Sequence, residues 1–305
     1  MLDICLLGTG GMMPMPERFL TALLARVNGR MVLIDCGEGT QVTMKMLGWG
    51  FKNIDVICFT HFHADHISGL PGLLLTIGNA GRTEPLTLVG PAGMPVIVEG
   101  LRRIAPELPF EIVYLELQKD VVSPLQFDEF EISFTPADHM VRCYAYRIDV
   151  RRKGKFDPKR AEALGLPRNL WGQLQKQGNV LYEGKEYTQS MVMGAERPGA
   201  SVAYCTDSRP VDRIATLAKG VQLLICEGMY GEEEKKPKAL ENKHMLFSEA
   251  ARLAKQAEAE ALWLTHFSPA LHEPEEFLHM ATDIFPNTEL GEDRKCTTLY
   301  FPKEG

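Results

Sequence analysis

The sequence predicts a layered α/β fold, and three observations lead to that prediction. Apolar runs typical of strands alternate with segments of helical periodicity along most of the 305 residues. Several of these runs end in histidine or aspartate, and one polar stretch, 151–199, interrupts the alternation. Interleaved strands and helices favour helices packed on sheets over an all-β barrel.

The elements follow from apolar runs bounded by glycine, proline and charge. We expect strands at Asp3–Leu7, Thr21–Arg26, Arg30–Asp35, Asp55–Thr60, Leu86–Val89, Glu111–Leu117, Phe130–Pro136, Cys143–Val150, Ser201–Cys205, Leu223–Glu227, Ala261–Thr265 and Thr297–Phe301. Helical periodicity predicts helices near 38–47, 67–79, 93–104, 211–218, 248–258 and 274–283.

The domain organisation follows from length and composition. A chain with 45% hydrophobic residues can fill one large core, so residues 1–305 are expected to form a single domain. Segment 151–199 begins with RRKGKFDPKR, which carries six basic residues and one aspartate, and continues as polar chain broken by Pro and Gly. It is expected to be an inserted arm that projects from the body and holds short helices at most.

Charge and composition exclude several classes of protein. A net charge of −7 gives the whole chain no electrostatic attraction for nucleic acid or anionic membrane, so a polyanion would need a local basic patch. The start, MLDICLLGTGG, lacks the basic region of a signal peptide, and no apolar run is long enough to span a membrane. Seven scattered cysteines without a CxxC pair indicate reduced thiols. We therefore expect a cytoplasmic protein that does not contact a membrane.

The most informative stretch is THFHADHISGL, residues 60–70. It places His61, His63, Asp65 and His66 where a predicted strand turns into a helix. Imidazole and carboxylate are the ligands that zinc takes when no thiolate is available, and one turn lets them converge. A lone buried histidine is usually a satisfied core residue, but four such groups together would need partners or a metal. The cluster therefore predicts a metal site.

Three further apolar runs end in a ligand-type residue: His139, Asp207 and His266. Each follows the carboxyl end of a predicted strand, the edge where α/β folds place their sites. Taken singly, each is as readily a turn, cap or core residue. Their coincidence indicates that they join the first cluster.

This constellation resembles the metallo-β-lactamase superfamily, whose HxHxDH signature is matched by residues 61–66. Within that superfamily the chain is most similar to the ribonuclease Z family, which removes 3′ trailers from precursor tRNA. The resemblance runs nearly the whole length, through LLGTGG, IDCGEGTQ, HFHADHISGLPGLL, TDSRP and LTHFS. It implies an αββα four-layer sandwich with two divalent ions between the sheets, zinc in the first place, although such sites also accept manganese, iron or cobalt.

The resemblance also implies roles for individual residues. His61, His63 and His139 would hold one ion, Asp65, His66 and His266 the other, and Asp207 would bridge them. Two such ions activate a water and clamp the oxygens of a phosphodiester. Asp65 would be the base, His244 would protonate the leaving 3′ oxygen, and Glu227 would orient His244. Read alone, His244 is as readily a solvated loop histidine and Glu227 a strand-end carboxylate.

Segment 151–199 lies where the family carries a tRNA-binding arm, and a homodimer would present RNA from one subunit to the other. The expected substrate contacts are Arg18, Arg151, Arg152, Lys153, Arg168 and Trp171. The alternative reading of the arm is a solvated surface loop.

The chain departs from the family pattern at groups that would face RNA. The arm has no Gly-Pro pair after Pro167, and His244 is followed by Met245-Leu246 instead of Ser-Thr. The PxKxRN motif appears as Pro14 to Phe19, without its lysine and asparagine, and the HEAT motif as Cys226 to Met229. The metal ligands are all kept.

Other functions therefore remain open at this point. One is a dinuclear hydrolase of small phosphodiesters or other esters. A second is a noncatalytic RNA- or metal-binding protein, which would have no need for a full ligand set. Glyoxalase or flavin-linked chemistry is less favoured by the spacing and the length.

Overall fold

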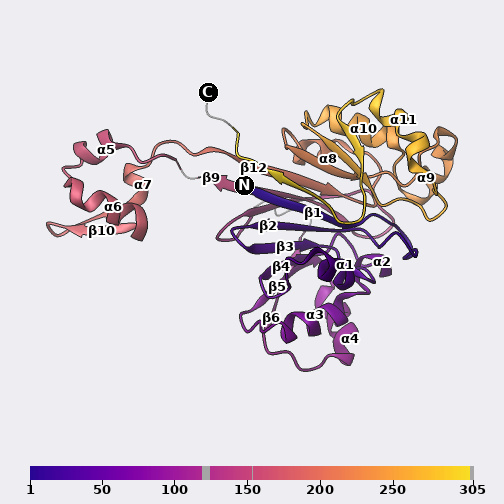
Figure 1. Cartoon of the computed structure of the whole chain (residues 1–305), viewed down its shortest axis with the longest axis horizontal. Coiled ribbons are helices and arrows are strands. Elements are labelled where there is room, and N and C mark those ends of the chain that lie inside the picture. The colour runs from indigo at the N-terminus through magenta and orange to yellow at the C-terminus, as the bar shows by residue number, and fades with distance from the viewer. Residues whose placement is uncertain (119–123, 153, 303–305) are drawn as a thin grey trace. The chain divides into compact units, whose positions relative to one another are not determined.

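The computed structural model describes residues 1–118, 124–152 and 154–302. The chain divides into a larger unit, Met1–Val150 with Ala200–Tyr300, and a smaller unit, Arg151–Gly199 with the segment from Phe301. In the larger unit two sheets lie face to face, and helices cover the outer side of each (Figure 1). The expectation of layered α/β architecture is confirmed for this unit.

The first sheet has the strand order β16-β1-β2-β3-β4-β5-β6, with parallel pairing from β3 to β6. Its strands in that order are Lys295–Leu299, Leu2–Gly8, Ala22–Val27, Arg30–Ile34, Ile54–Cys58, Leu86–Pro91 and Ile112–Leu117. The helices after these strands are α1 (Thr40–Leu47), α2 (Ala64–Ile67), α3 (Leu70–Asn79), α4 (Met94–Leu101) and the 3₁₀ turn Arg102–Ile104.

The second sheet has the order β15-β14-β13-β12-β9-β8-β7, and its strands from β12 to β15 are parallel. In that order the strands are Thr288–Leu290, Leu262–Thr265, Leu223–Glu227, Arg197–Cys205, Tyr144–Arg152, Glu131–Pro136 and Leu125–Gln126. Its helices are α8 (Asp212–Leu217), α9 (Lys236–Asn242), α10 (Phe247–Gln256) and α11 (His279–Thr282), with 3₁₀ turns at Glu233–Lys235 and Pro274–Phe277.

The central strands of each sheet, such as β1, β4, β13 and β14, are buried on both faces, as expected for sheets covered on one side by helices and on the other by a second sheet. Cys5 and Leu7 of β1 pack toward the first helical layer, whereas Ile4 and Leu6, which alternate with them, are equally buried on the other face. Contacts between the sheets include the Tyr146 hydroxyl, which donates to the Phe59 carbonyl at 2.6 Å. The parallel strands direct their carboxyl ends to one edge, and that edge carries the candidate site.

The smaller unit has its own core, made by Ala161, Leu166, Leu174, Val180, Tyr187 and Val192. It contains α5 (Pro158–Ala163), α6 (Arg168–Gln177), α7 (Gln189–Val192) and the hairpin of β10 (Asn179–Tyr182) and β11 (Lys185–Thr188). The ten-residue α6 and the hairpin show that the expectation of short helices at most was wrong. Polar surface positions hid the few apolar residues that form this core.

Two helix predictions also need correction. The helix expected at 67–79 is divided, because the Gly69 N–H donates to the Cys36 carbonyl at 2.9 Å and not to a carbonyl of the preceding turn. The helix expected at 274–283 is a 3₁₀ turn followed by the short α11. Within the described ranges, none of the helices has the length and apolarity that crossing a bilayer requires.

Candidate active site

The sequence-predicted metal ligands converge from both sheets at the carboxyl ends of their strands. His61, His63, Asp65 and His66 follow β4 of the first sheet. His139 follows β8, Asp207 follows β12 and His266 follows β14, all in the second sheet. Side chains separated by about 200 residues in sequence therefore meet in one place.

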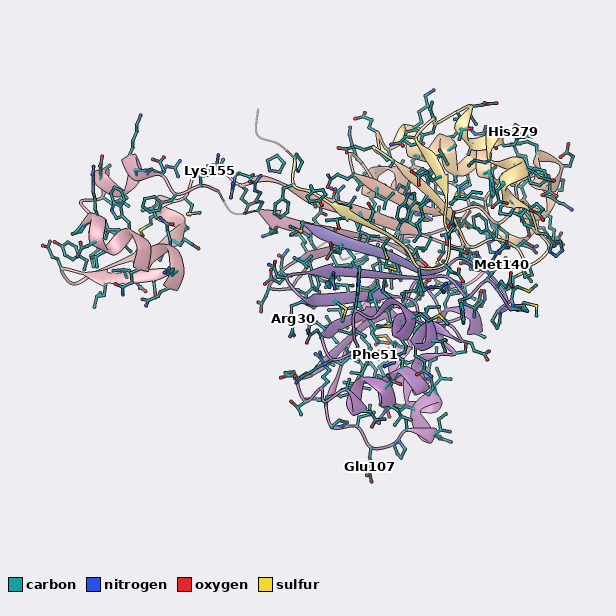
Figure 2. The ribbon with its side chains drawn as sticks, viewed as in Figure 1. Arg30, Phe51, Glu107, Met140, Lys155 and His279 are labelled. Atoms are coloured by element: carbon teal, nitrogen blue, oxygen red, sulfur yellow. The ribbon has the colours of Figure 1, made fainter. Side chains whose placement is uncertain are left out.

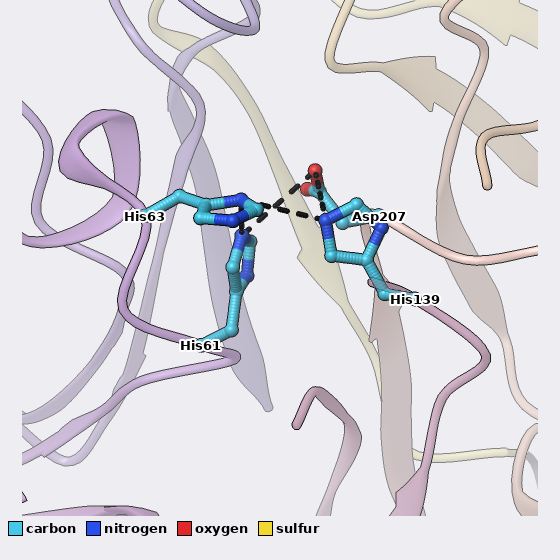
Figure 3. A group of neighbouring side chains, drawn as sticks. All are labelled: His61, His63, His139 and Asp207. Carbon is cyan, nitrogen blue, oxygen red and sulfur yellow. Dashed lines mark hydrogen bonds and ion pairs between the residues drawn. The ribbon is translucent and has the colours of Figure 1, made fainter. Parts of the chain in front are cut away.

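The first group of donors is formed by His61, His63, His139 and Asp207. Figure 3 shows the three imidazoles directed toward the Asp207 carboxylate. His61 Nε2 lies 2.9 Å from His63 Nδ1, and His139 Nε2 lies 3.4 Å from the same atom. Asp207 Oδ1 is 3.9 Å from His61 Nε2 and 3.8 Å from His139 Nε2.

The second group is formed by Asp65, His66, His266 and the other oxygen of Asp207. Asp207 Oδ2 lies 3.1 Å from His66 Nε2 and 3.1 Å from His266 Nε2. Asp65 Oδ2 lies 3.5 Å and 3.6 Å from the same two nitrogens. Asp207 thus belongs to both groups and offers one oxygen to each.

These donor sets fit divalent cations. A tetrahedral ion with bonds of 2.0–2.1 Å holds its ligand atoms about 3.3 Å apart, and the measured separations scatter around that value. In the described part of the chain, His66 Nε2, Asp207 Oδ2 and His266 Nε2 are buried without a hydrogen-bond partner. Buried polar atoms without partners are rare in native proteins, and a bound cation would satisfy all three.

The electrostatics of the site favour positive charge between the carboxylates. Burial alone would raise the pKa of Asp207, but His266 and His66 hold this pKa well below its usual value. Burial would lower the pKa of His66, but Asp207 and Asp35 raise it well above the usual value. Burial, reinforced by His66, lowers the pKa of His61 well below its ordinary value, so this imidazole is neutral and can donate a lone pair.

Asp35 is a buried residue that contacts the candidate site and that sequence reasoning missed. It is fully buried at the end of β3, and its Oδ2 accepts a hydrogen bond from His66 Nδ1 at 2.8 Å. Thr60 donates to Asp35 through its backbone N–H and its hydroxyl, and the same hydroxyl lies 3.1 Å from His61 Nδ1. Asp35 therefore fixes the tautomer of His66 and, through Thr60, the ring of His61. Its place at the end of an apolar strand, followed by Cys-Gly, was the available signal.

The backbone is unusual at three of these strand ends. Asp35, Asp207 and His266 have φ angles of 61°, 44° and 58°, a region that residues other than glycine seldom adopt. Such conformations persist where the surrounding structure requires them, and they cluster at functional sites. Close approach of the chain contributes to this requirement, because a Cβ on Gly11 would lie 2.7 Å from the His266 ring.

The predicted catalytic residues lie beside the two groups. His244 Nδ1 is 3.0 Å from Glu227 Oε2, whose other oxygen accepts from the Ser208 N–H. Burial would lower the pKa of His244, but the charge of Glu227 raises it to about 9. Asp65 Oδ2 accepts from the backbone N–H of Met12 at 2.7 Å, a contact that the sequence did not indicate.

A cavity of about 300 Å³ opens onto the site. Its lining consists of Met12, His63, Asp65, His139, Met140, Asp207, Tyr230, Lys238, Glu241, Asn242, His244 and His266. Met12 and Met140 are 65% and 66% exposed, and Figure 2 labels Met140 on the larger unit. The cavity therefore combines donor atoms for metal ions with side chains that are exposed to solvent.

The predicted substrate contacts are not part of this cavity. The Arg18 guanidinium donates to the Leu271 carbonyl at 2.9 Å and lies over the Phe267 ring. Trp171 packs inside the smaller unit, where its Nε1 donates to the Leu166 carbonyl at 2.8 Å.

The four basic residues proposed for the arm all belong to the smaller unit. Arg168 pairs with Glu162 at 2.7 Å and lies over the Trp171 ring. Arg151 is exposed, Arg152 lies over the Phe301 ring, and Lys153 falls outside the described residues.

Comparison with known proteins shows the family. The family model described as Anti-Pycsar protein Apyc1 matches residues 2–93, and the beta-lactamase superfamily domain matches residues 174–267. Ribonuclease Z of Lachnospira eligens is 54% identical over 305 residues and covers 100% of both chains. Ribonuclease Z of Clostridium acetobutylicum is 53% identical over 306 residues and covers 99% of each. The chain belongs to the ribonuclease Z family.

Solved structures confirm the fold expected for the family. The short form of human tRNase Z superposes with a TM-score of 0.70 at 22% identity, over 98% of this chain and 100% of that one. The metallo-beta-lactamase fold protein YhfI of Bacillus subtilis gives 0.70 at 19% identity, over 97% and 98%. These structures confirm the four-layer sandwich. The relatives at more than 50% identity confirm the expected resemblance, and the chain is a metal-dependent hydrolase of the endoribonuclease class.

Proposed function

We propose that this chain removes the 3′ trailer of precursor tRNA by hydrolysing one phosphodiester bond at the cavity beside Asp207. The observation that carries the proposal is the pair of donor groups sharing Asp207, in a chain that matches ribonuclease Z relatives along its full length. The proposed substrate is a polyanion. The cavity is lined by side chains that can bind cations, and these cations would attract the phosphates of the substrate.

The two donor groups would hold two divalent cations, and zinc is the proposed ion. His61, His63 and His139 would bind one ion, and Asp65, His66 and His266 the other, with Asp207 shared. Nitrogen and oxygen donors at tetrahedral spacing suit zinc, and manganese, iron or cobalt can also occupy them. When bound, such a pair supplies an activated water and neutralises charge on the phosphate oxygens.

The chain's own residues supply proton transfer. Asp65 is the proposed base, because its carboxylate lines the cavity and the Met12 N–H holds one of its oxygens in place. His244 is the proposed acid for the leaving 3′ oxygen. Glu227 binds His244 Nδ1 and so leaves Nε2 as the nitrogen that can donate to the substrate. Glu227 is a positioning residue, since Ser208 anchors its other oxygen.

We further propose that the smaller unit is the tRNA-binding arm. Exposed cations such as Arg168 and Arg151 would contact phosphates of the RNA, and Arg152 and Lys153 are proposed as further phosphate contacts. Trp171 supports this role by packing under Arg168 within the core of the arm. Arg18 supports the cavity from outside by binding the loop that carries Leu271.

We propose a homodimer that uses the exposed apolar side chains of α1 and α3. Val42, Met46 and Leu75 are 43%, 61% and 40% exposed, and the two helices pack together. Met46→Glu would lower the fraction of dimer in sedimentation, whereas Val96→Glu on α4 would not. Unchanged self-association in Met46→Glu would refute this dimer face.

The cytoplasm is the proposed location of the protein, which agrees with its seven free cysteines.

One experiment tests the proposed activity. Purified zinc-loaded protein is incubated with precursor tRNA and, separately, with bis(p-nitrophenyl) phosphate. Release of a 3′ trailer at one position is the expected result. Hydrolysis of the small diester without cleavage of precursor tRNA would overturn the assigned substrate while keeping the hydrolytic site.

A further inference from the structure

One wall of the cavity carries side chains that the steps above do not use. Tyr230 follows β13, and Lys238 and Asn242 come from α9. The Lys238 ammonium lies over the Tyr230 ring at 5.6 Å, and Asn242 Nδ2 donates to the Tyr230 hydroxyl at 3.4 Å. These contacts tie the three side chains into one polar wall.

Lys238 supplies a charge that the rest of the cavity lacks. Among the described residues that line the cavity, it is the one lysine or arginine, beside the carboxylates of Asp65, Asp207 and Glu241. Arg18, the cation nearest in sequence to Met12, is already bound to Leu271. Lys238 is therefore the one lysine or arginine side chain that a nucleic acid strand entering this cavity meets in the lining that the structure describes.

The wall is fixed with respect to the metal ligands. Helix α9 ends at Asn242 and is capped by Lys243, whose φ is 58° and whose carbonyl lies 3.4 Å from His139 Nδ1. His244 follows immediately, and its ring lies 6.5 Å from the Tyr230 ring. Tyr230 is only 5% exposed, so its ring is a rigid support for the ammonium.

We propose that Lys238 binds a phosphate of the RNA strand next to the scissile phosphodiester and that Tyr230 is its positioning residue. The inference rests on the proposed function, because a neighbouring phosphate exists only in a polynucleotide substrate. The contact between Lys238 and this phosphate is solvent-accessible, and the scissile phosphate is bound by the catalytic groups. It therefore contributes to binding of RNA and little to the chemical step.

The experiment compares Lys238→Met with Lys236→Met in the full-length, zinc-loaded protein. Lys236 lies on the same helix but lines a different cavity with Pro210 and Glu249, so it is a matched control. Lys238→Met is expected to raise KM for precursor tRNA about fivefold with little change in kcat. The slope of log(kcat/KM) against log salt concentration becomes shallower by about 0.7, the value for one single-strand phosphate contact. Lys238→Arg restores both quantities.

The small diester separates the possible failures. It carries no second phosphate, so the ratio of kcat/KM for RNA to kcat/KM for bis(p-nitrophenyl) phosphate falls about fivefold in Lys238→Met and stays constant in Lys236→Met. Equal behaviour of the two variants, or equal loss on both substrates, overturns the role of Lys238. If the unmodified protein does not cleave precursor tRNA, that result contradicts the proposed function itself and is distinct from a failure of the role of Lys238.

Discussion

The larger and the smaller unit differ in how each holds its functional side chains. In the larger unit, His61, His66 and Asp207 are almost fully buried and anchored at strand ends by partners such as Asp35. In the smaller unit, proposed contacts such as Arg151 and Arg168 are exposed, and the unit has its own core of six buried side chains. The residues proposed for bond cleavage are thus held rigidly at the strand ends of the larger unit, whereas most residues proposed for RNA recognition belong to a small separate unit. The following changes test that division.

The largest effect is expected from His63→Ala. Loss of one ligand removes several kcal/mol of transition-state stabilisation, so hydrolysis of both precursor tRNA and a small diester falls roughly 10³-fold. Metal content measured by elemental analysis falls in parallel. His279→Ala is the control, because His279 is exposed on α11 and belongs to none of the donor groups found in the described chain (Figure 2). Retained turnover of the diester would refute the metal assignment.

Replacement of 151–199 by a short turn should separate the two substrates. Strands β9 and β12 are neighbours in the second sheet, so the two segments of the larger unit can be joined between Val150 and Ala200, which lie within these strands. Several phosphate contacts are lost together, and kcat/KM for precursor tRNA is expected to fall on the order of 10²-fold. Hydrolysis of the small diester falls far less. Equal loss on both substrates would show that the segment supports the fold of the larger unit.

Asp35→Asn tests the support behind the ligands. The amide cannot accept hydrogen bonds from both Thr60 and His66 as the carboxylate does, so the orientation of His66 is weakened. Metal affinity, measured by competition with a chelator, is expected to fall about 10- to 100-fold. Asp149→Asn, which weakens the ion pair with Arg147, is the control. Unchanged affinity in Asp35→Asn would mean that His66 is held without this carboxylate.

The smallest effect on hydrolysis is expected from Leu174→Ala. Leu174 is fully buried in the core of the smaller unit, and its truncation should lower that unit's free energy of unfolding by about 2–5 kcal/mol. Hydrogen exchange should quicken within 151–199 and remain unchanged at β4, β12 and β14. Leu181→Ala, at a side chain that is 74% exposed, should have little effect. Faster exchange at β4 would show that the two units unfold together.

Sequence patterns predicted the strands of the larger unit well, because buried strands of packed sheets are continuous apolar runs. Leu223–Glu227 was predicted to the residue, and most other strands differ by one or two residues at an end. The hairpin Asn179–Tyr182 with Lys185–Thr188 and helix α9 were missed, since their apolar residues are few and separated by charge. The core of segment 151–199 was not predicted for the same reason.

The sequence by itself determined which side chains can bind metal, because ligand chemistry belongs to residue type and HxHxDH places four donors on one turn. It also determined the family, which depends on motifs spread along the whole chain. Only the tertiary structure decided that Asp35 orients His66, that the Met12 N–H binds Asp65 and that Lys238 reaches the cavity. Each of these depends on distances between strand ends or helices far apart in sequence, and no local pattern encodes such distances.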